Sequence, residues 1–183
     1  MKQTSSLEPS PEVLKAATRA QAQPHEDELA RDLHNGVCTN PFAFLGCHLQ
    51  ADDGLYRLRV FAPGCSAVSA LSPADRRVLC QLQRVSDSAL FVGVVALAAS
   101  GDYLLRLESD LGTRDIEDPY RFGSWLGQTD AWLLSEGSHL RPWEKLGSHP
   151  CSLEGVAGVA FAVWAPNARQ VSLAGEFNLW NGR

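Results

Sequence analysis

Two groups of side chains in this sequence can in principle do acid–base chemistry. Asp115, Glu117 and Asp118 place three carboxylates within four positions, and paired carboxylates catalyse transfer at glycosidic bonds. We interpret this cluster as a solvated loop. His48 and His149 form the second group, but no nucleophile stands near either at a recognisable spacing. We expect them to make a structural hydrogen bond, so the residues themselves define no catalytic site.

Cysteine usage indicates the compartment and argues against a metal. Five cysteines stand at positions 38, 47, 65, 80 and 151, an odd number with no Cys-x-x-Cys pair. Neither a disulfide framework nor a zinc site is expected from such spacing. We expect reduced thiols in a cytoplasmic protein, with no metal and no cofactor.

Charge and hydropathy exclude two kinds of partner. The chain has 16 basic and 21 acidic residues, a formal net charge of −5, and so lacks the basic field that nucleic acid requires. The longest apolar run, 89–100, is shorter than the roughly 20 residues that cross a bilayer. Residues 1–24 are polar and have no signal-peptide pattern. Neither a nucleic acid nor a membrane is an expected partner.

Residues 25–116 are predicted to form a β-sandwich domain with a leading helix. The preceding residues, 1–24, are rich in Ser, Gln, Pro and Ala and are predicted to be a disordered tail. A helix is expected over 26–35, where Leu29 and Leu33 stand four apart and Gly36 follows. Short β-type runs separated by turn residues then indicate an antiparallel sandwich. These runs are 55–61, 67–71, 78–85, 90–97 and 103–108.

Residues 117–150 are predicted to be an aromatic-rich linker. Pro119 disfavours a helix just before it, and 130–136 are expected to form one or two helical turns ended by Gly137. Trp125, Trp132 and Trp143 are expected to pack one sandwich against the next. Strands are predicted to return at 159–164 and 170–174.

An internal repeat relates the two β regions. Val60-Phe61-Ala62-Pro63 recurs as Val163-Trp164-Ala165-Pro166, and Val68-Ser69 as Val171-Ser172, both at an offset of 103. Leu45-Gly46-Cys47-His48 recurs as Leu146-Gly147-Ser148-His149 at an offset of 101. We interpret this as two tandem copies of one sandwich. Such a sandwich takes about 100 residues, so residues 151–183 are predicted to be the start of a second, truncated module.

Five stretches of the chain resemble bacterial 1,4-α-glucan branching enzymes of glycoside hydrolase family 13. They are 40–46, 118–123, 130–142, 161–169 and 175–183. The resemblance covers residues 26–183. The block 130–142 is specific to branching enzymes, whereas Trp-Ala-Pro-Asn-Ala at 164–168 also occurs in debranching relatives.

The resemblance implies an all-β chain of tandem immunoglobulin-like β-sandwiches with a short N-terminal helix, the first sandwich complete and the second a truncated family-48 carbohydrate-binding module. In the full-length family a TIM-type catalytic barrel and a C-terminal β-domain follow. The family forms α-1,6 branches in glycogen by retaining transfer between two carboxylates. Those carboxylates lie on the barrel, so the resemblance assigns no catalytic residue here. It implies α-1,4-glucan and the barrel as partners.

Trp180 and Asn178 are the candidate glucan-binding residues. They match the family's Gly-x-Phe-Asn-x-Trp stretch, whose Trp sits in a glucan site, and an aromatic face can stack on a glucose ring. Asn178 can donate to a sugar hydroxyl, or serve as a turn residue. The alternative for Trp180 is packing. Trp164, within a predicted strand, is expected in the core. At the offset of 103 Trp180 corresponds to Arg77, so the first copy is expected to be structural.

Three functions remain open from the sequence. The first is the non-catalytic N-terminal part of a branching enzyme, which positions the barrel and contacts glucan; no activity is expected of this part alone. The second is a stand-alone module that binds α-glucan or a partner. An incomplete second sandwich argues against it, because open sheet edges aggregate. The third is the N-terminal region of a glycogen debranching enzyme, which the blocks 118–123 and 130–142 disfavour.

Overall fold

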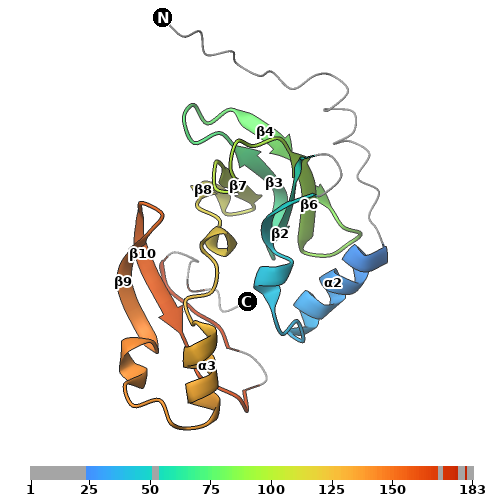
Figure 1. Cartoon of the computed structure of the whole chain (residues 1–183). Helices are drawn as coiled ribbons and strands as arrows, with labels where there is room; N and C mark the ends of the chain where they lie inside the picture. The colour runs from blue at the N-terminus through green and yellow to red at the C-terminus, as the bar shows by residue number, and fades with distance from the viewer. Residues whose placement is uncertain (1–23, 51–53, 169–170, 177–179, 181–183) are drawn as a thin grey trace, which may run out of the picture. The chain divides into compact units, whose positions relative to one another are not determined.

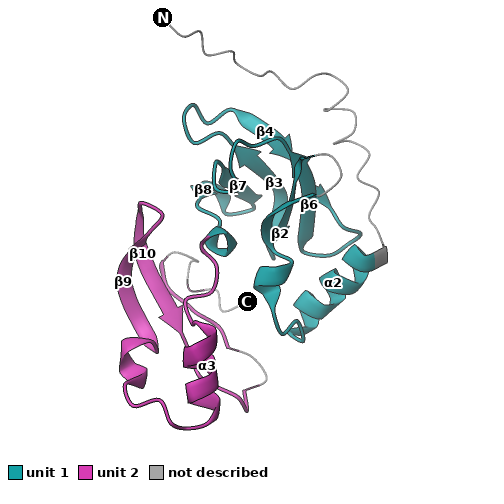
Figure 2. Ribbon diagram, viewed as in Figure 1, with its two compact units in different colours: residues 1–121 teal, residues 122–183 magenta. Residues whose placement is uncertain are grey.

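The chain forms two compact units, residues 1–121 and 122–183 (Figures 1 and 2). A computed structural model describes residues 24–50, 54–168, 171–176 and 180. The tail predicted for residues 1–24 therefore lies outside the described residues, apart from Pro24. The two units divide after Arg121, inside the segment 117–150 that was predicted to be a linker.

The first unit is a sandwich of two four-stranded antiparallel sheets preceded by a helix (Figure 1). Helix α2 spans Pro24–Asn35, and the 3₁₀ turn η1 spans Pro41–Ala43. One sheet has the order β1-β2-β6-β5 and the other β4-β3-β7-β8. The strands are β1 Gly46–Leu49, β2 Tyr56–Phe61, β3 Cys65–Leu71, β4 Val78–Gln81, β5 Gln83–Arg84, β6 Leu90–Val95, β7 Leu104–Ser109 and β8 Gly112–Ile116. The turn η2, Pro119–Phe122, follows at the boundary of the units.

Two apolar clusters hold this unit together. The larger one joins the two sheets: Leu58 and Phe91 come from the first sheet, and Val68 and Leu105 from the second. The second cluster lies on the other face of the first sheet and includes Leu29 of α2. The sheet β1-β2-β6-β5 is therefore covered on both faces, by the second sheet and by α2.

The described part of the second unit contains one α-helix and one β-hairpin. Helix α3 spans Gln128–Ser135, the 3₁₀ turn η3 spans Pro142–Glu144, and β9 Gly147–Leu153 pairs antiparallel with β10 Val156–Ala162. Glu154 and Gly155 connect the strands with φ of 50° and 80°, as a two-residue hairpin turn requires. The predicted all-β class, with antiparallel sheets and a short leading helix, is confirmed.

Several predicted strands differ in detail. The run 78–85 divides into β4 and β5, which belong to different sheets. Strands β1, β8 and β9 were not predicted; β8 is a sheet edge with mostly exposed polar side chains, which leave no hydrophobic alternation. Residues 171–174, within the predicted strand 170–174, have no regular structure, and β10 ends at Ala162, before Trp164.

The internal repeat is present in the backbone and extends beyond the matching letters. Each copy begins with a helix ended by a glycine of positive φ, 68° at Gly36 and 70° at Gly137. The backbone N–H of Val37 donates to Asp32 O, and that of Ser138 donates to Leu133 O, both at 3.0 Å. These helix ends are 101 residues apart and satisfy the same carbonyls, as the Schellman motif does.

The next segment repeats as well. We call residues 41–48 and 142–149 the lead-in motifs. Each starts with a proline whose carbonyl accepts the N–H of the leucine four residues later, at 2.7 Å for Leu45 and 2.8 Å for Leu146. The glycine after each leucine has a φ of 87° or 95°. The chain then enters the first strand of a hairpin in both copies.

The hairpin registers agree with the two sequence offsets. Gly46 pairs with Arg59 in the first copy, and Gly147 pairs with Ala162 in the second. Adding 101 to the first residue and 103 to the second converts one pair into the other. The duplication predicted from short letter matches is therefore confirmed in helix ends, turns and strand pairing.

Candidate glucan-contact site and its supporting residues

Trp180 presents an open aromatic surface in the second unit. Its side chain is 71% exposed, its φ is 59°, and its backbone N–H donates to Gly175 O at 2.8 Å. An exposed indole on a backbone held by such a bond suits stacking on a sugar ring. Asn178, the other candidate, lies outside the described residues.

The first copy has an arginine where the second has this tryptophan. Arg76 has a φ of 60°, and its N–H donates to Ser72 O at 3.0 Å. Ser72 corresponds to Gly175 at the offset of 103, so the structural counterpart of Trp180 is Arg76, one residue from the expected Arg77. The Arg76 guanidinium bonds Asp115 at 3.2 Å, and the first copy has no stacking aromatic at this position.

Trp164 does not lie in a core, and the prediction that it would is wrong. It stands two residues beyond the end of β10 and is 42% exposed. Its counterpart Phe61 is half-buried and packs against the cluster beneath α2. The described part of the second unit provides no comparable cluster over Trp164.

An apolar stripe on the second unit corresponds to core positions of the first. Val159, Phe161 and Val163 are exposed, whereas their counterparts at the offset of 103 belong to or pack against the core between the sheets. Those counterparts are Tyr56, Leu58 and Val60. The stripe thus has core character, although the described residues leave it open.

The three tryptophans of the segment 117–150 have different surroundings. Trp125 stacks on His149 with ring centroids 5.8 Å apart, and its Nε1–H donates to Lys145 O at 3.0 Å. Trp132 and Trp143 are exposed. Of the three, Trp125 packs on the hairpin strand that carries His149.

A charged network ties α3 to the second lead-in motif. Asp130 on α3 accepts from His139 Nε2 at 3.1 Å and lies 3.4 Å from Lys145 Nζ. His139 Nδ1 accepts the N–H of Arg141 at 3.2 Å, which fixes the imidazole in its Nε2–H form. The hydrogen bond from His139 lowers the pKa of Asp130, and the Lys145 charge acts in the same direction.

The same three positions are apolar or neutral in the first copy. At the offset of 101 Asp130, His139 and Lys145 correspond to members of the cluster between α2 and the sheet. Those members are Leu29, Cys38 and Phe44. At these three positions, apolar contacts in the first copy correspond to charged and polar contacts in the second.

The acidic cluster does not form a paired-carboxylate site. Asp115 bridges Arg106 at 2.8 Å, and Glu117 accepts from Arg121 at 2.6 Å. Asp118 was expected in a solvated loop, and that prediction is wrong because its side chain is almost fully buried. It accepts from Tyr103 Oη at 2.5 Å and from Tyr120 N–H at 2.9 Å. Desolvation raises the pKa of Asp118, although these donors oppose the shift.

Sequence reasoning missed the buried ion pair that anchors α2. Glu26 is 2% exposed and accepts from Arg57 Nη1 at 2.7 Å, and Arg59 Nε lies 3.5 Å from the same oxygen. The sequence contained a signal for this ion pair. Arg57 and Arg59 alternate with apolar residues along β2, which places both arginines on the face of the sheet that α2 covers. Arginine on a covered sheet face requires an acid on the covering element.

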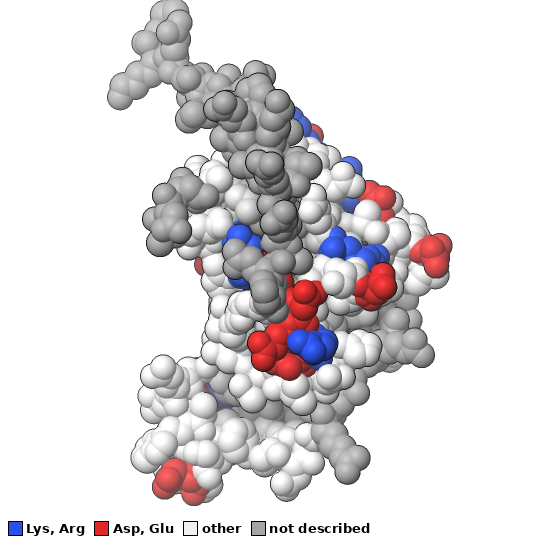
Figure 3. Space-filling view, turned by 90° about the vertical axis from the view of Figure 1, so that its right-hand side faces the viewer, with Lys and Arg blue, Asp and Glu red and all other residues white. Residues whose placement is uncertain are grey.

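The described surface of the first unit also has a depression, which differs in character from the open indole of Trp180. An open depression of about 370 Å³ lies between α2 and the turn after β5, lined by Asp27, Ala30, Arg31, His34, Asn35, Ser86, Asp87 and Ser88. Its lining includes the imidazole of His34 but no Phe, Tyr or Trp side chain. Figure 3 shows acidic and basic side chains side by side on one face, without a broad basic patch. The described helices include none that could span a membrane, and the described residues contain no cluster fit to hold a metal ion.

The fold and the repeat define a class: a β-sandwich domain followed by a segment that repeats the leading elements of that domain. The family described as alpha-1,4-glucan branching enzyme GlgB, N-terminal domain, matches residues 25–120, and carbohydrate-binding module 48 (isoamylase N-terminal domain) matches residues 145–183. The first match covers just over half of the chain. The chain belongs to the N-terminal domain family of the branching enzyme GlgB.

Curated relatives agree with this family. The 1,4-alpha-glucan branching enzyme GlgB of Roseobacter denitrificans is 46% identical over 155 residues, 84% of this chain and 21% of the relative. That of Rhodospirillum rubrum is 47% identical over 150 residues, 79% of this chain and 20% of the relative. That of Rubrobacter xylanophilus is 45% identical over 158 residues, 86% and 21%. The chain thus spans about a fifth of the length of these relatives.

Proposed function

We propose that this chain is the non-catalytic N-terminal part of an enzyme that forms α-1,6 branches in glycogen. In this proposal it positions the catalytic barrel and contacts α-1,4-glucan through Trp180 and Asn178. The chain has no catalytic role of its own. Its partners are the glucan and the barrel, and its compartment is the cytoplasm.

The exposed indole of Trp180 is the observation that carries the glucan contact. It is large and open, and the backbone that carries it is held by a hydrogen bond to Gly175, so an indole face is available for stacking on a sugar ring. The first copy has Arg76 at this position, engaged with Asp115. This difference supports a division of labour in which the first sandwich supports the assembly and the second contacts the substrate.

Two observations support the structural and cellular parts of the proposal. The first sandwich has a closed core and a helix clamped by Glu26, as a rigid spacer requires. All five cysteines are described and unpaired, which is the usual state in a reducing cytoplasm.

The first test compares the 183-residue chain with the full-length enzyme. We expect the chain alone to leave the iodine stain of amylose unchanged and the full-length enzyme to shift it. A stain shift by the purified chain, with contaminating enzymes excluded, would overturn its non-catalytic role.

The second test measures maltoheptaose binding by calorimetry on the full-length enzyme. Trp180→Ala should weaken binding at the module's site by about fivefold, because an aromatic contact contributes about 1 kcal/mol. Asn178→Ala should also weaken binding at this site if the Asn178 amide donates to a sugar hydroxyl. Trp132→Ala removes a similarly exposed indole and is the control. Unchanged affinity in a folded Trp180→Ala variant would assign Trp180 to packing.

A further inference from the structure

The segment that follows β8 packs against the first lead-in motif, which leads into the first hairpin of the same sandwich. Asp118, just after β8, holds Tyr103 Oη with one carboxylate oxygen and the N–H of Tyr120 with the other. This places the Tyr120 ring edge-on against Phe42 of the first lead-in motif, with centroids 5.2 Å apart and planes at 62°. Such an edge-to-face pair contributes beyond its buried area.

Tyr120 also covers the glycine of that motif. A Cβ built on Gly46 would lie 3.1 Å from the Cβ of Tyr120. Gly46 is buried, and Leu45 beside it is 1% exposed. The first lead-in motif therefore forms a binding position for an aromatic side chain, which we call the seat. Phe42 contacts the ring of the bound side chain from one side, and Gly46 lies beneath it.

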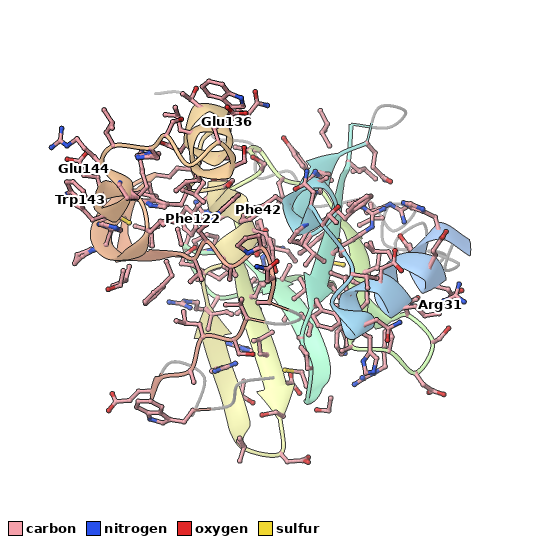
Figure 4. All side chains as sticks on the ribbon, turned by 90° about the horizontal axis from the view of Figure 1, so that it is seen from below. Arg31, Phe42, Phe122, Glu136, Trp143 and Glu144 are labelled. Atoms are coloured by element: carbon pink, nitrogen blue, oxygen red, sulfur yellow. The ribbon has the colours of Figure 1, made fainter. Side chains whose placement is uncertain are left out.

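The second lead-in motif has the same backbone, and the described residues leave its seat open. Trp143 takes the place of Phe42, is 65% exposed and projects from η3 (Figure 4). No described atom comes within 4 Å of a Cβ built on Gly147. Gly147 is exposed, and Leu146 is only half-buried.

We propose that the seat formed by Trp143, Leu146 and Gly147 receives an aromatic side chain from the segment that leaves the second sandwich of the full-length enzyme. The occupant is an aromatic residue on a short extended or 3₁₀ segment, as Tyr120 is in the first copy. The contacting aromatic ring is larger in the second copy, since an indole replaces a phenyl ring. Trp143 then acts as a positioning residue between the carbohydrate-binding module and the segment that leaves the second sandwich. The inference rests on the proposed function, because it requires the longer enzyme.

Photo-crosslinking in the full-length enzyme tests the occupant directly. Trp143→p-benzoylphenylalanine keeps a bulky aromatic at the seat and forms a covalent bond with its neighbour on irradiation. Phe42→p-benzoylphenylalanine is the matched reference, and its crosslink should map to residues 117–122, around Tyr120. We expect the position-143 crosslink to map by mass spectrometry to the segment immediately after the second sandwich.

A position-143 crosslink to the catalytic barrel or to another molecule would overturn the inference. So would its absence while position 42 crosslinks as expected. Branching activity of the unsubstituted enzyme is measured separately by iodine staining. An enzyme that branches amylose but gives no crosslink from position 143 to the following segment would disprove the seat and leave the proposed function intact.

Discussion

His48 and His149 are 101 residues apart and make the same hydrogen bond. The Nε2–H of each donates to the carbonyl of the leucine three residues earlier, Leu45 O at 2.9 Å and Leu146 O at 3.0 Å. Both carbonyls belong to the turn that delivers the chain into a hairpin strand. The expectation of a shared structural bond is confirmed, and the two imidazoles serve the turn.

Replacing His48 should therefore destabilise the first unit without abolishing its fold. His48→Ala removes one partly buried hydrogen bond and should cost about 1 kcal/mol in unfolding free energy. His48→Gln keeps an N–H donor at a similar reach and should recover most of the loss. Urea unfolding of the two variants measures the difference, and equal stability of both would assign the histidine to packing.

The repeat shows how much of the fold could be predicted from the sequence. Short matches at two offsets sufficed to predict duplication, because the letters that the two copies share mark the turn into the hairpin and the end of its second strand or the residues just after it. The helix ends at Gly36 and Gly137 share geometry with little common sequence, so they could be equated only from the backbone. Strand β8 escaped prediction because a polar edge strand shows no alternation.

The candidate site was less predictable than the fold. Trp180 was found by its family motif, and its exposure suits the predicted role. The burial of Asp118 could not be deduced, because it depends on Tyr103, fifteen residues away, pointing at the same spot. The burial of Trp164 was predicted wrongly because the phenyl ring of its counterpart Phe61 packs against the cluster beneath α2, and the described residues of the second unit provide no equivalent apolar cover.

Breaking the buried ion pair between α2 and β2 should cause a large loss of stability. Glu26→Gln removes the carboxylate that pairs with both Arg57 and Arg59. Breaking a buried pair by removing one partner costs about 3 kcal/mol. Thermal unfolding of the 183-residue chain should show this loss, whereas Glu28→Gln, an exposed site on the same helix, should change stability by less than about 0.5 kcal/mol. Similar effects of the two variants would contradict the role of Glu26.

The Tyr103–Asp118 pair should respond differently to its two conservative variants. Tyr103→Phe leaves a buried carboxylate oxygen without its donor and should cost about 2 kcal/mol. Asp118→Asn should cost less at neutral pH, because the amide can accept from Tyr120 N–H and donate to the tyrosine oxygen. Urea titrations of both proteins at pH 7 compare them, and a larger loss in Asp118→Asn would show that the charge itself is required.

Asp118 also predicts a pH dependence with a definite sign. Burial raises its pKa in the folded state, so the folded protein binds this proton more tightly than the unfolded chain does. The Asp118 contribution to stability should therefore increase as pH falls from 7 through the raised pKa towards the ordinary carboxyl range. Other carboxylates titrate in the same window, so the measured quantity is the stability of the unsubstituted chain minus that of Asp118→Asn. A difference that moves the opposite way with falling pH would show that the pKa is not raised.

The attachment of α3 should be more sensitive to salt than that of α2, because the ion pair that anchors α2 through Glu26 is buried and buried pairs are screened much less. Asp130 contacts His139 and Lys145, while the corresponding positions of the first copy are Leu29, Cys38 and Phe44. Salt at 1 M shortens the screening length to about 3 Å, so hydrogen exchange should accelerate more in α3 than in α2.

Low pH should weaken the attachment of α3 in the same way. The pKa of Asp130 is lowered, so its contribution to stability is present above the ordinary carboxyl pKa and is lost as pH falls through the lowered value. Asp130→Asn should remove both responses from α3, whereas Glu136→Gln, at the exposed end of the same helix, should retain them. If α3 in Asp130→Asn still loses protection with salt as the unsubstituted chain does, the network does not hold the helix, and its attachment must come from Trp125 and the half-buried leucines of α3.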